Sequence, residues 1–451
     1  MKPSLLLLCL ALFLPSQAAA AGLRAGVARI DITPDLPFWL TGYASRSRPA
    51  TNVAQRISAK ALALDDGNGG RIVLVTTDLI GIPAYICEEA SAAIRQRTDW
   101  RRDQVLFNAS HTHAGPMIWA NLQVMFDLNP EDETRARDYA RTLAHKLTEV
   151  ASQAVGNLAA AQVAFGQGEA GFATNRREFT PDGVRIGVNP SGAMDHSVPV
   201  LRVTSESGKL LAVVFGYACH NTTLGGDCYA VHGDYAGRAQ AALEAAHPGT
   251  TAMFLMLCGG DQNPHPRGTM ELAIQHGEAL ATEVDRVLNG HLTELAPPIR
   301  TGFDTLRVDF APQERATFET EAESPDRFRQ RRARAMLAAD DAGAPVRHLP
   351  YPIQAVRLGD DLTLLALAGE TVVDYALRAK HQFETPHLVV AGYCNDVACY
   401  ICTRQIIAEG GYEPVSSMIY YGQPGPLADS AEETIFDGVT KLLGRLGVNP
   451  R

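Results

Sequence analysis

Short apolar runs rich in Val, Ile and Leu alternate with longer amphipathic segments along most of this 451-residue chain. Short apolar runs are typical of buried strands and the longer segments of helices, so the alternation predicts an α/β fold with mixed β-sheets flanked by helices. The predicted strands cover residues 27–32, 59–64, 71–79, 104–110, 161–166 and 251–257. The predicted helices cover residues 87–96, 136–155, 235–246, 271–288 and 371–380.

Two further segments have the pattern of β-hairpins. Residues 198–218 contain two apolar runs around Ser207-Gly208, and residues 353–369 turn at Gly359-Asp360. Residues 313–343 differ because they are crowded with Glu, Asp and Arg, which predicts a solvated helical excursion. No internal repeat or low-complexity linker divides the chain, so we expect one large domain over residues 21–451.

The first twenty residues have the pattern of a secretory signal peptide. Lys2 precedes the apolar run from Leu5 to Pro15, and small residues follow up to Ala20 and Ala21. No later run approaches the roughly 18 apolar residues that a membrane helix needs. We therefore expect residues 1–20 to be removed and the mature chain to be secreted or periplasmic, with no transmembrane segment.

The charge balance argues against a nucleic-acid partner. The chain has 40 Lys and Arg against 50 Asp and Glu, a formal charge of -10 at pH 7. An acidic chain repels phosphate backbones. A small-molecule substrate is the more plausible partner, and the oligomeric state is left open.

Export changes how the cysteines are interpreted, because disulfides persist in oxidising compartments. Of the eight cysteines, only Cys9 lies in the leader. Spacing predicts local bridges between Cys219 and Cys228 and within the trio Cys394, Cys399 and Cys402. The C-x4-C-x2-C spacing of that trio also occurs in iron-sulfur proteins, but an exported chain without a nearby fourth cysteine favours a disulfide and a buried thiol.

Two histidine motifs carry the strongest chemical signal. In SHTHAGP, His111 and His113 follow a predicted strand, and an extended backbone would point both imidazoles to the same side. In YACHNTTLGGDCYAVHGDYAG, Cys219 and His220 should face opposite sides of a strand, which argues against a Cys-His dyad. Imidazole is a common zinc ligand, whereas surface or structural histidines are the alternative.

Two further segments supply polar residues that are weaker signals by themselves. LCGGDQNPHPRG follows a predicted strand and contains Asn263 in a loop rich in Gly and Pro. LALAGETVVDY and GYCNDVACYICT contain Glu370 and Tyr400. No G-x-S-x-G, H-E-x-x-H, phosphate-loop or dinucleotide-binding motif is present.

Taken in order, these segments resemble the catalytic domain of the neutral and alkaline non-lysosomal ceramidases, a family of secreted zinc amidohydrolases. The resemblance runs from about Gly26 to Leu427 and begins with GVARIDITP and the GYA of residues 42–44. It implies the fold of that domain, one bound Zn²⁺ and an N-acylsphingosine amidohydrolase activity in sphingolipid metabolism.

The resemblance also implies a zinc-ligand set. SHTHAGP is similar to THTHSGP, which implies His111 as a ligand and His113 as a catalytic histidine at the reacting centre. YACHNTTL, AGETVVDY and ACYICT resemble the segments that supply the other ligands, which implies His220, Glu370 and Tyr400.

Two catalytic residues that face the substrate are implied in the same way. TNRREF resembles the family's N-R-S segment, which implies Arg176, and GYEPVSSMIYYG resembles a segment whose tyrosine contacts the substrate, which implies Tyr412. The family has a serine nucleophile in G-[DN]-x-S-P, but this chain has Asn263 at that place. Only 29 residues follow Gly422, so we also expect the family's C-terminal immunoglobulin-like domain to be missing (451 minus 422).

The sequence therefore predicts a secreted zinc-dependent hydrolase of an amide bond, with a ceramidase-type lipid as the first substrate candidate. Because an amide side chain cannot form an acyl-enzyme, the expected nucleophile is zinc-activated water, with Asn263 as a catalytic residue that positions the water or binds the carbonyl. The alternatives are a deacylase or esterase for a smaller acyl group, such as an acetylated sugar, and a binding protein with a metal-supported pocket.

Overall fold

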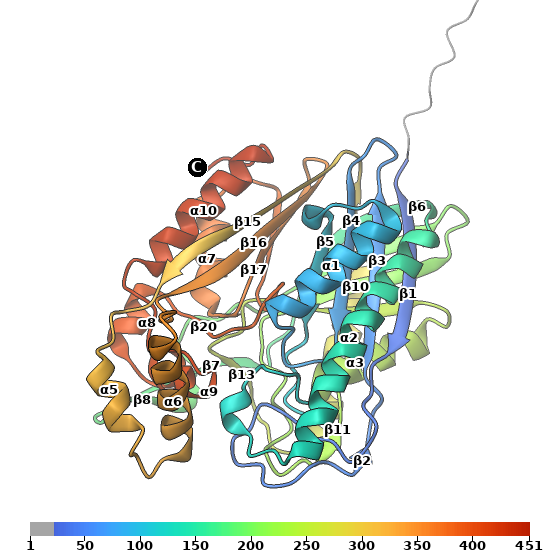
Figure 1. Cartoon of the computed structure of the whole chain (residues 1–451). Coiled ribbons are helices and arrows are strands. Elements are labelled where there is room, and N and C mark those ends of the chain that lie inside the picture. Colours follow the sequence, from blue (N-terminus) through green and yellow to red (C-terminus); the bar gives the residue numbers. More distant parts are fainter. Residues whose placement is uncertain (1–21) are drawn as a thin grey trace, which may run out of the picture.

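Three β-sheets surround a common apolar core in the computed structural model, which describes residues 22–451 (Figure 1). The predicted signal peptide, residues 1–20, lies outside the described residues. Each sheet contributes side chains to this core, for example Leu62, Val214 and Val356. Mixed sheets flanked by helices were predicted from the sequence, and the structure confirms that fold class.

The first two sheets are hydrogen-bonded into one nine-stranded path, in which two residue pairs of β1 and β6 join them within residues 22–451. The first sheet has the order β1-β3-β4-β5, and the second has the order β12-β10-β9-β6 with β14 paired to β6. Their strands are β1 (Arg24–Asp31), β3 (Ser58–Asp65), β4 (Arg71–Thr77), β5 (Val105–Ala109), β6 (Ala159–Glu169), β9 (Ser197–Ser205), β10 (Leu210–Tyr217), β12 (Thr251–Met256) and β14 (Thr293–Leu295).

The third sheet is built from the C-terminal part of the chain in the order β15-β16-β17-β19. Its strands are β15 (Ile299–Asp309), β16 (His348–Leu358), β17 (Leu362–Leu367) and β19 (His387–Ala391). Both predicted hairpins are confirmed, as β9–β10 and β16–β17. Smaller pairings complete the strands: β2 (Asn52–Val53) with β11 (Ala230–Val231), β18 (Glu370–Thr371) with β20 (Tyr400–Ile401), and β13 (Gln262–Pro264) with β7 (Ala173–Thr180) and β8 (Gly183–Asn189).

Helices cover the outer face of each sheet (Figure 1). The first sheet is covered by α1 (Ala84–Thr98) and α2 (Pro130–Gly156), and the second by α3 (Asp234–Ala246) and α4 (Met270–Leu288). The third is covered by α7 (Val373–Gln382) and α10 (Ala431–Arg445), with α8 (Arg404–Glu409) and α9 (Ser417–Tyr420) nearby. No described helix combines the length and the hydropathy that crossing a bilayer requires.

Strand β3 shows why the sheets are buried on both faces. Its alternate residues Ala59 and Ala61 face the helices of the first sheet, while Leu62 and Leu64 face the central core. Successive side chains on a strand point to opposite faces, so a continuous apolar run fits a strand covered on both sides. Each leucine buried in this way contributes roughly 2 kcal/mol.

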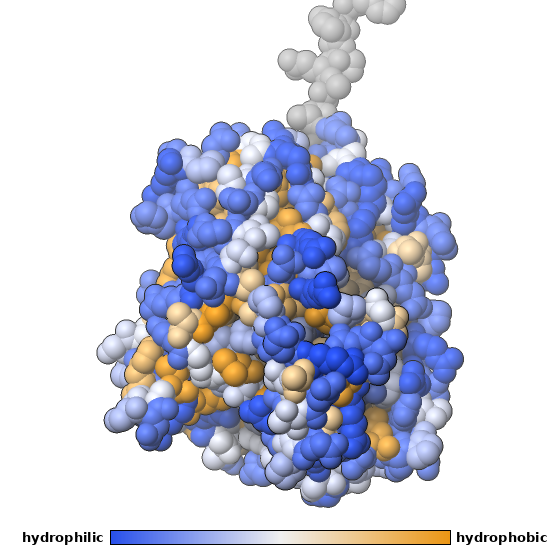
Figure 2. All heavy atoms as spheres, turned by 60° about the vertical axis from the view of Figure 1, so that its left-hand side comes forward, coloured by the Kyte–Doolittle hydropathy of each residue, from blue (hydrophilic) through white to orange (hydrophobic). Residues whose placement is uncertain are grey.

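The charged segment forms two helices, α5 (Arg315–Glu321) and α6 (Arg327–Asp341), as predicted. The segment is largely exposed, as expected, but it is also anchored to the fold: Arg332 is buried, and Arg331 donates to the carbonyls of Val124 (3.2 Å) and Phe126 (2.8 Å). Figure 2 brings this side of the molecule forward and shows hydrophilic side chains with small apolar patches between them. The long basic stems allow α6 to pack against a neighbouring loop while its charges remain paired.

The predicted local disulfides are wrong: all seven cysteines that the structure describes are free thiols. Cys219 packs beneath α3 and α4, whereas Cys228 belongs to a separate small cluster. Cys394 lies in the central core, while Cys399 and Cys402 pack towards α7 and α10. Cysteines whose side chains point into different layers cannot be bridged without moving the backbone.

Candidate metal and active site

The buried side chain of Asn108 ties together one edge strand from each sheet. Its Nδ2 atom donates to the carbonyls of Met256 on β12 (3.1 Å) and Gly392 directly after β19 (2.9 Å). Its Oδ1 atom accepts from the backbone N–H of Met256 (2.9 Å). Because Asn108 lies on β5, the segments that follow β5, β12 and β19 are brought to one place.

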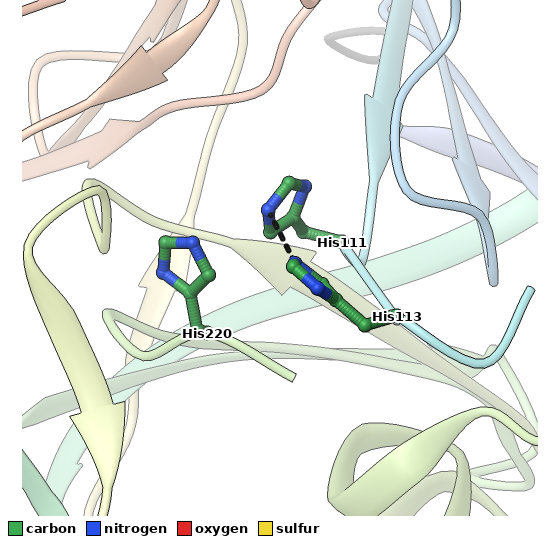
Figure 3. Close-up of side chains that lie close together, drawn as sticks. All are labelled: His111, His113 and His220. Atoms are coloured by element: carbon green, nitrogen blue, oxygen red, sulfur yellow. Dashed lines mark hydrogen bonds between the residues drawn. The ribbon is translucent and has the colours of Figure 1, made fainter. Parts of the chain in front are cut away.

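The two histidines of SHTHAGP do converge, but the backbone between them is not extended. His111 has φ +63°, a left-handed conformation that is uncommon for residues other than glycine. The Nε2 atoms of His111 and His113 lie 3.1 Å apart, and His220 lies beside them (Figure 3). The predicted convergence is thus present, while the predicted strand geometry at this point is wrong.

Glu370 and Tyr400 complete this cluster from the C-terminal part of the chain. The Oε2 atom of Glu370 lies 3.0 Å from the Nε2 atoms of both His111 and His220. The hydroxyl of Tyr400 lies 3.2 Å from His220 Nε2. The short strands β18 and β20 pair Glu370 with Tyr400, which explains how two residues from separate segments of the chain reach the same point.

Hydrogen bonds on the far side of each imidazole decide which nitrogen faces the cluster. The Nδ1 atom of His111 donates to the carbonyl of Ile80 (2.5 Å), and that of His220 donates to the carbonyl of Gly259 (2.7 Å). A carbonyl can only accept, so both Nδ1 atoms carry the hydrogen and both rings turn Nε2 towards the cluster, where a neutral ring of this tautomer presents a lone pair. This is the arrangement by which metal-binding histidines are oriented.

The cluster fits a small divalent cation. Burial, and then the charge of Arg176, lowers the pKa of His220 to about 3, so this ring is neutral near pH 7. Its lone pair therefore points at the anionic Glu370, an arrangement that a cation between them would stabilise. Zinc bonds of 2.0–2.1 Å in a tetrahedron place ligand atoms about 3.3 Å apart, close to the 3.0–3.2 Å separations found here.

Arg176 and Asn263 lie next to these donors. Arg176 donates through Nη2 to the Tyr400 hydroxyl (2.9 Å) and through Nη1 to His220 Nε2 (3.1 Å) and Asn263 Oδ1 (3.4 Å). Asn263 Oδ1 also accepts from the hydroxyl of Thr222 (3.1 Å). With its oxygen held from two sides, the amide group of Asn263 has a defined orientation, and its Nδ2 is the group that remains to meet a ligand.

The aromatic residue predicted to face the substrate, Tyr412, is also present at the site. Its ring centroid lies 5.7 Å from that of Tyr400, and the guanidinium carbon of Arg176 lies 5.6 Å from the Tyr412 centroid. All eight residues singled out from the sequence are therefore brought together: His111, His113, Arg176, His220, Asn263, Glu370, Tyr400 and Tyr412.

Sequence reasoning missed several residues that contact this cluster. The hydroxyl of Tyr421 donates to Glu370 Oε1, and Glu413 forms an ion pair with Arg176. Both lie in GYEPVSSMIYYG, from which only Tyr412 was selected. The segment is rich in Tyr and Glu, which is the one sequence feature that points to these residues. The sequence does not show, however, which of these side chains are buried against the site and which are exposed to solvent.

The loop before the first histidine motif encloses His113. A Cβ atom on Gly42, which has φ +96°, would lie 2.5 Å from the His113 ring, so only glycine allows this contact. Buried Arg46 donates to the carbonyls of Thr41 (2.5 Å), His113 (2.7 Å) and Cys228 (3.0 Å). Burial next to His111 and His220 holds the pKa of His113 well below its usual value.

The fold and this cluster define an α/β protein with a buried histidine and carboxylate site of metal-binding type. A family model described as neutral/alkaline non-lysosomal ceramidase, N-terminal, matches residues 23–269, which is more than half of the 451 residues. The chain belongs to the neutral/alkaline non-lysosomal ceramidase family.

Individual relatives agree with that assignment. The neutral ceramidase of Pseudomonas aeruginosa is 23% identical over 533 aligned positions, which cover 99% of this chain and 76% of that protein. The neutral ceramidase of Drosophila pseudoobscura pseudoobscura is 29% identical over 102 residues, 22% of this chain and 14% of that protein.

Solved structures show the same fold. The crystal structure of the Pseudomonas aeruginosa neutral ceramidase superimposes with a TM-score of 0.70 and 18% identity, over 93% of this chain and 73% of that chain. A structure described as ceramidase complexed with C2 gives the same TM-score and identity, over 93% and 74%.

Proposed function

We propose that this chain is an exported, zinc-dependent amidohydrolase of the ceramidase type, which cleaves the amide bond of an N-acylsphingosine-like lipid. One observation carries the zinc assignment: the Nε2 atoms of His111 and His220 each lie 3.0 Å from the same carboxylate oxygen of Glu370, and the hydroxyl of Tyr400 lies 3.2 Å from His220 Nε2. His111, His220, Glu370 and Tyr400 would hold the ion. Family membership supports the hydrolase, and the leader-like sequence of residues 1–20 supports export.

When bound, a zinc ion supplies Lewis-acid chemistry, since it polarises an acyl carbonyl and lowers the pKa of water towards about 7. The chain's own residues move the proton. Because its pKa is depressed, His113 is neutral at pH 7, so its ring keeps one unprotonated nitrogen that can accept a proton from attacking water and pass it to the leaving nitrogen.

Three residues orient the acyl group in this proposal. Arg176 and Tyr412 border the site, and the Nδ2 atom of Asn263 is free to donate to the carbonyl oxygen as negative charge develops on it. The amide of Asn263 is held by Thr222 and Arg176, so its hydrogen-bond donor is positioned before the substrate arrives. A water nucleophile makes the serine of the family pattern unnecessary.

Asn263 also supports a second candidate, a deacylase or esterase for a smaller acyl group such as an acetylated sugar. Asparagine occupies the serine position of the family pattern, so the reaction chemistry differs from that pattern and the substrate can differ with it. A binding protein with the same metal-supported pocket is the remaining alternative.

The test uses purified mature protein whose zinc content has been measured. Hydrolysis of a short-chain fluorescent ceramide is compared with that of an N-acetyl sugar and a simple acetyl ester, each with and without chelator. Chelator-sensitive cleavage of the ceramide is the expected result. Cleavage of the acetyl substrates alone would favour the second candidate, and bound zinc without any turnover would favour the binding protein.

A further inference from the structure

Two adjacent arginines on β7 share a single buried carboxylate. Arg176 Nε lies 2.9 Å from Glu413 Oε1, and Arg177 Nη1 lies 2.6 Å from Glu413 Oε2. The three side chains are 4%, 3% and 2% exposed, so these charges are almost completely removed from water. Burying charges is costly unless they are paired in good geometry, which makes this an arrangement that the fold must maintain.

Neighbouring residues on a strand normally point to opposite faces, yet both arginines reach Glu413. The pairing of β7 with β8 explains this, because the register shifts between Asn175 and Arg177. Such an irregularity re-aims side chains and is common next to active sites. The local structure of β7 therefore directs both guanidinium groups towards the same carboxylate.

Glu413 itself lies on an unusual turn, the π-helix Tyr412–Ser416. Two consecutive residues of this turn make different contacts. The ring of Tyr412 faces the guanidinium of Arg176, and the carboxylate of Glu413 accepts hydrogen bonds from both arginines. Burial alone would raise the pKa of Glu413, but the paired Arg176 and Arg177 lower it, so the carboxylate is ionised.

The planar guanidinium links this carboxylate to the site. Glu413 holds Arg176 at Nε, while Nη1 and Nη2 of the same group reach Asn263, His220 and Tyr400 at 2.9–3.4 Å. Because the fork is rigid, fixing one edge fixes the direction of the other nitrogens. A change at Glu413 would therefore move donors that lie within reach of the reacting groups.

We propose that Glu413 is a positioning residue that sets the orientation of the Arg176 guanidinium, with Arg177 as the second cation that holds Glu413 in place. The kinetic part of this inference rests on the proposed function. Glu413 acts through Arg176, and it makes no direct contact with the substrate. Loss of Glu413 should consequently reduce turnover more than substrate binding.

The central experiment compares Glu413→Gln with Glu409→Gln. Glutamine at 413 has a single oxygen, so it can accept from one arginine while its N–H group faces the other. The two arginines can then no longer both be held, and the direction of the Arg176 guanidinium is no longer fixed. Glu409 pairs with Arg177 Nη2 (3.0 Å) and is 21% exposed, which makes it the matched control. We expect kcat of the 413 variant to fall about 100-fold with KM changed less than about threefold, and the 409 variant to retain wild-type kinetics.

A spectroscopic measurement separates this inference from the proposed reaction. In arginine-labelled protein, the slowly exchanging Nε–H resonance of Arg176, assigned by its loss in Arg176→Lys, should disappear in Glu413→Gln and persist in Glu409→Gln. A wild-type protein with no hydrolysis would contradict the proposed function alone, because this resonance still reports the positioning. A 413 variant that keeps the resonance or the full kcat overturns the inference.

Arg176→Lys provides a second variant in case Glu413→Gln does not fold. A single ammonium group cannot pair with Glu413 and also reach Asn263 and Tyr400, so its kcat should fall about as far as that of Glu413→Gln. A lysine variant with wild-type kcat would show that a held guanidinium is unnecessary, and it would refute the proposal.

Discussion

The two parts of the chain that form the site contribute different chemistry. The part covered by the family model, residues 23–269, supplies nitrogen: the imidazoles of His111, His113 and His220 and the guanidinium of Arg176. The C-terminal part supplies oxygen, from carboxylates and phenols, at Glu370, Tyr400, Tyr412, Glu413 and Tyr421. Neither part contains all four of the ligands proposed above, so the proposed zinc site should depend on docking of the third sheet against the first two.

The largest effect should come from removing one donor from either part. His111→Ala and Glu370→Ala should each weaken zinc binding by more than about 100-fold and abolish chelator-sensitive hydrolysis, because each leaves an incomplete site. Zinc content and activity would be measured side by side. His145→Ala, an exposed histidine on α2, is the control and should retain both. If only one of the two site variants lost zinc, the comparison between the two parts would be wrong.

A smaller effect is expected from the support of Glu370. Tyr421→Phe removes the hydroxyl that donates to Glu370 Oε1 and keeps the ring, so the carboxylate loses its orientation but remains present. Hydrogen-bond partners of ligands typically contribute 10–100-fold to metal affinity, so zinc affinity should fall within about that range. Titration of chelator-stripped protein measures it. Tyr420→Phe is the matched control, and an equal loss in both variants would contradict a specific role for Tyr421.

A third prediction concerns how the free energy of unfolding depends on pH through a buried histidine in residues 23–269. Burial, and then the charge of Arg238, lowers the pKa of His232 from 6.5 to about 4, and its Nδ1 accepts from the backbone N–H of Asp234 (2.8 Å). Between these pKa values the unfolded chain binds more protons than the folded one. The contribution of the neutral His232 to the free energy of unfolding is therefore complete above pH 6.5 and is lost as the pH falls towards 4.

At pH 5 this loss amounts to about 2 kcal/mol. Urea unfolding at pH 7.5 and pH 5 would be compared for wild type and His232→Asn, both with chelator present so that metal release does not contribute. The wild type should lose about 2 kcal/mol more than the variant on acidification. Equal losses would show that His232 does not titrate as its burial implies.

The smallest effect should come from a surface ion pair in the charged helical segment, residues 313–343. Arg315 pairs with Glu319 on α5 at 3.0 Å, with both side chains about half exposed to solvent. Exposed pairs of this kind contribute little, so Arg315→Ala should reduce the free energy of unfolding by less than about 1 kcal/mol and leave activity unchanged. Urea unfolding measures the stability change. A loss comparable to that of a buried pair would mean that this surface has a structural role.

The elements of the fold were largely predictable, because hydrophobic periodicity is a local property. The helix predicted over 235–246 is α3, Asp234–Ala246, and both hairpin turns were located correctly. The helix predicted to start at residue 136 begins at Pro130, since the Asn129 side chain accepts from Asp132 N–H and caps it. The first turn of this helix is acidic, so it lacks the apolar residues on which the prediction depended.

The sequence by itself determined the strands and helices, the candidate residues and the family resemblance, because these depend on residue type and order. Tertiary structure decided which residues meet: Asn108 joins three sheet edges, and Tyr421 and Glu413 support Glu370 and Arg176. It also placed Cys394 in a different layer from Cys399 and Cys402, and all the described cysteines are free thiols. The physical reason is that spacing along the chain predicts neighbours within one element, whereas contacts between elements depend on how the sheets pack.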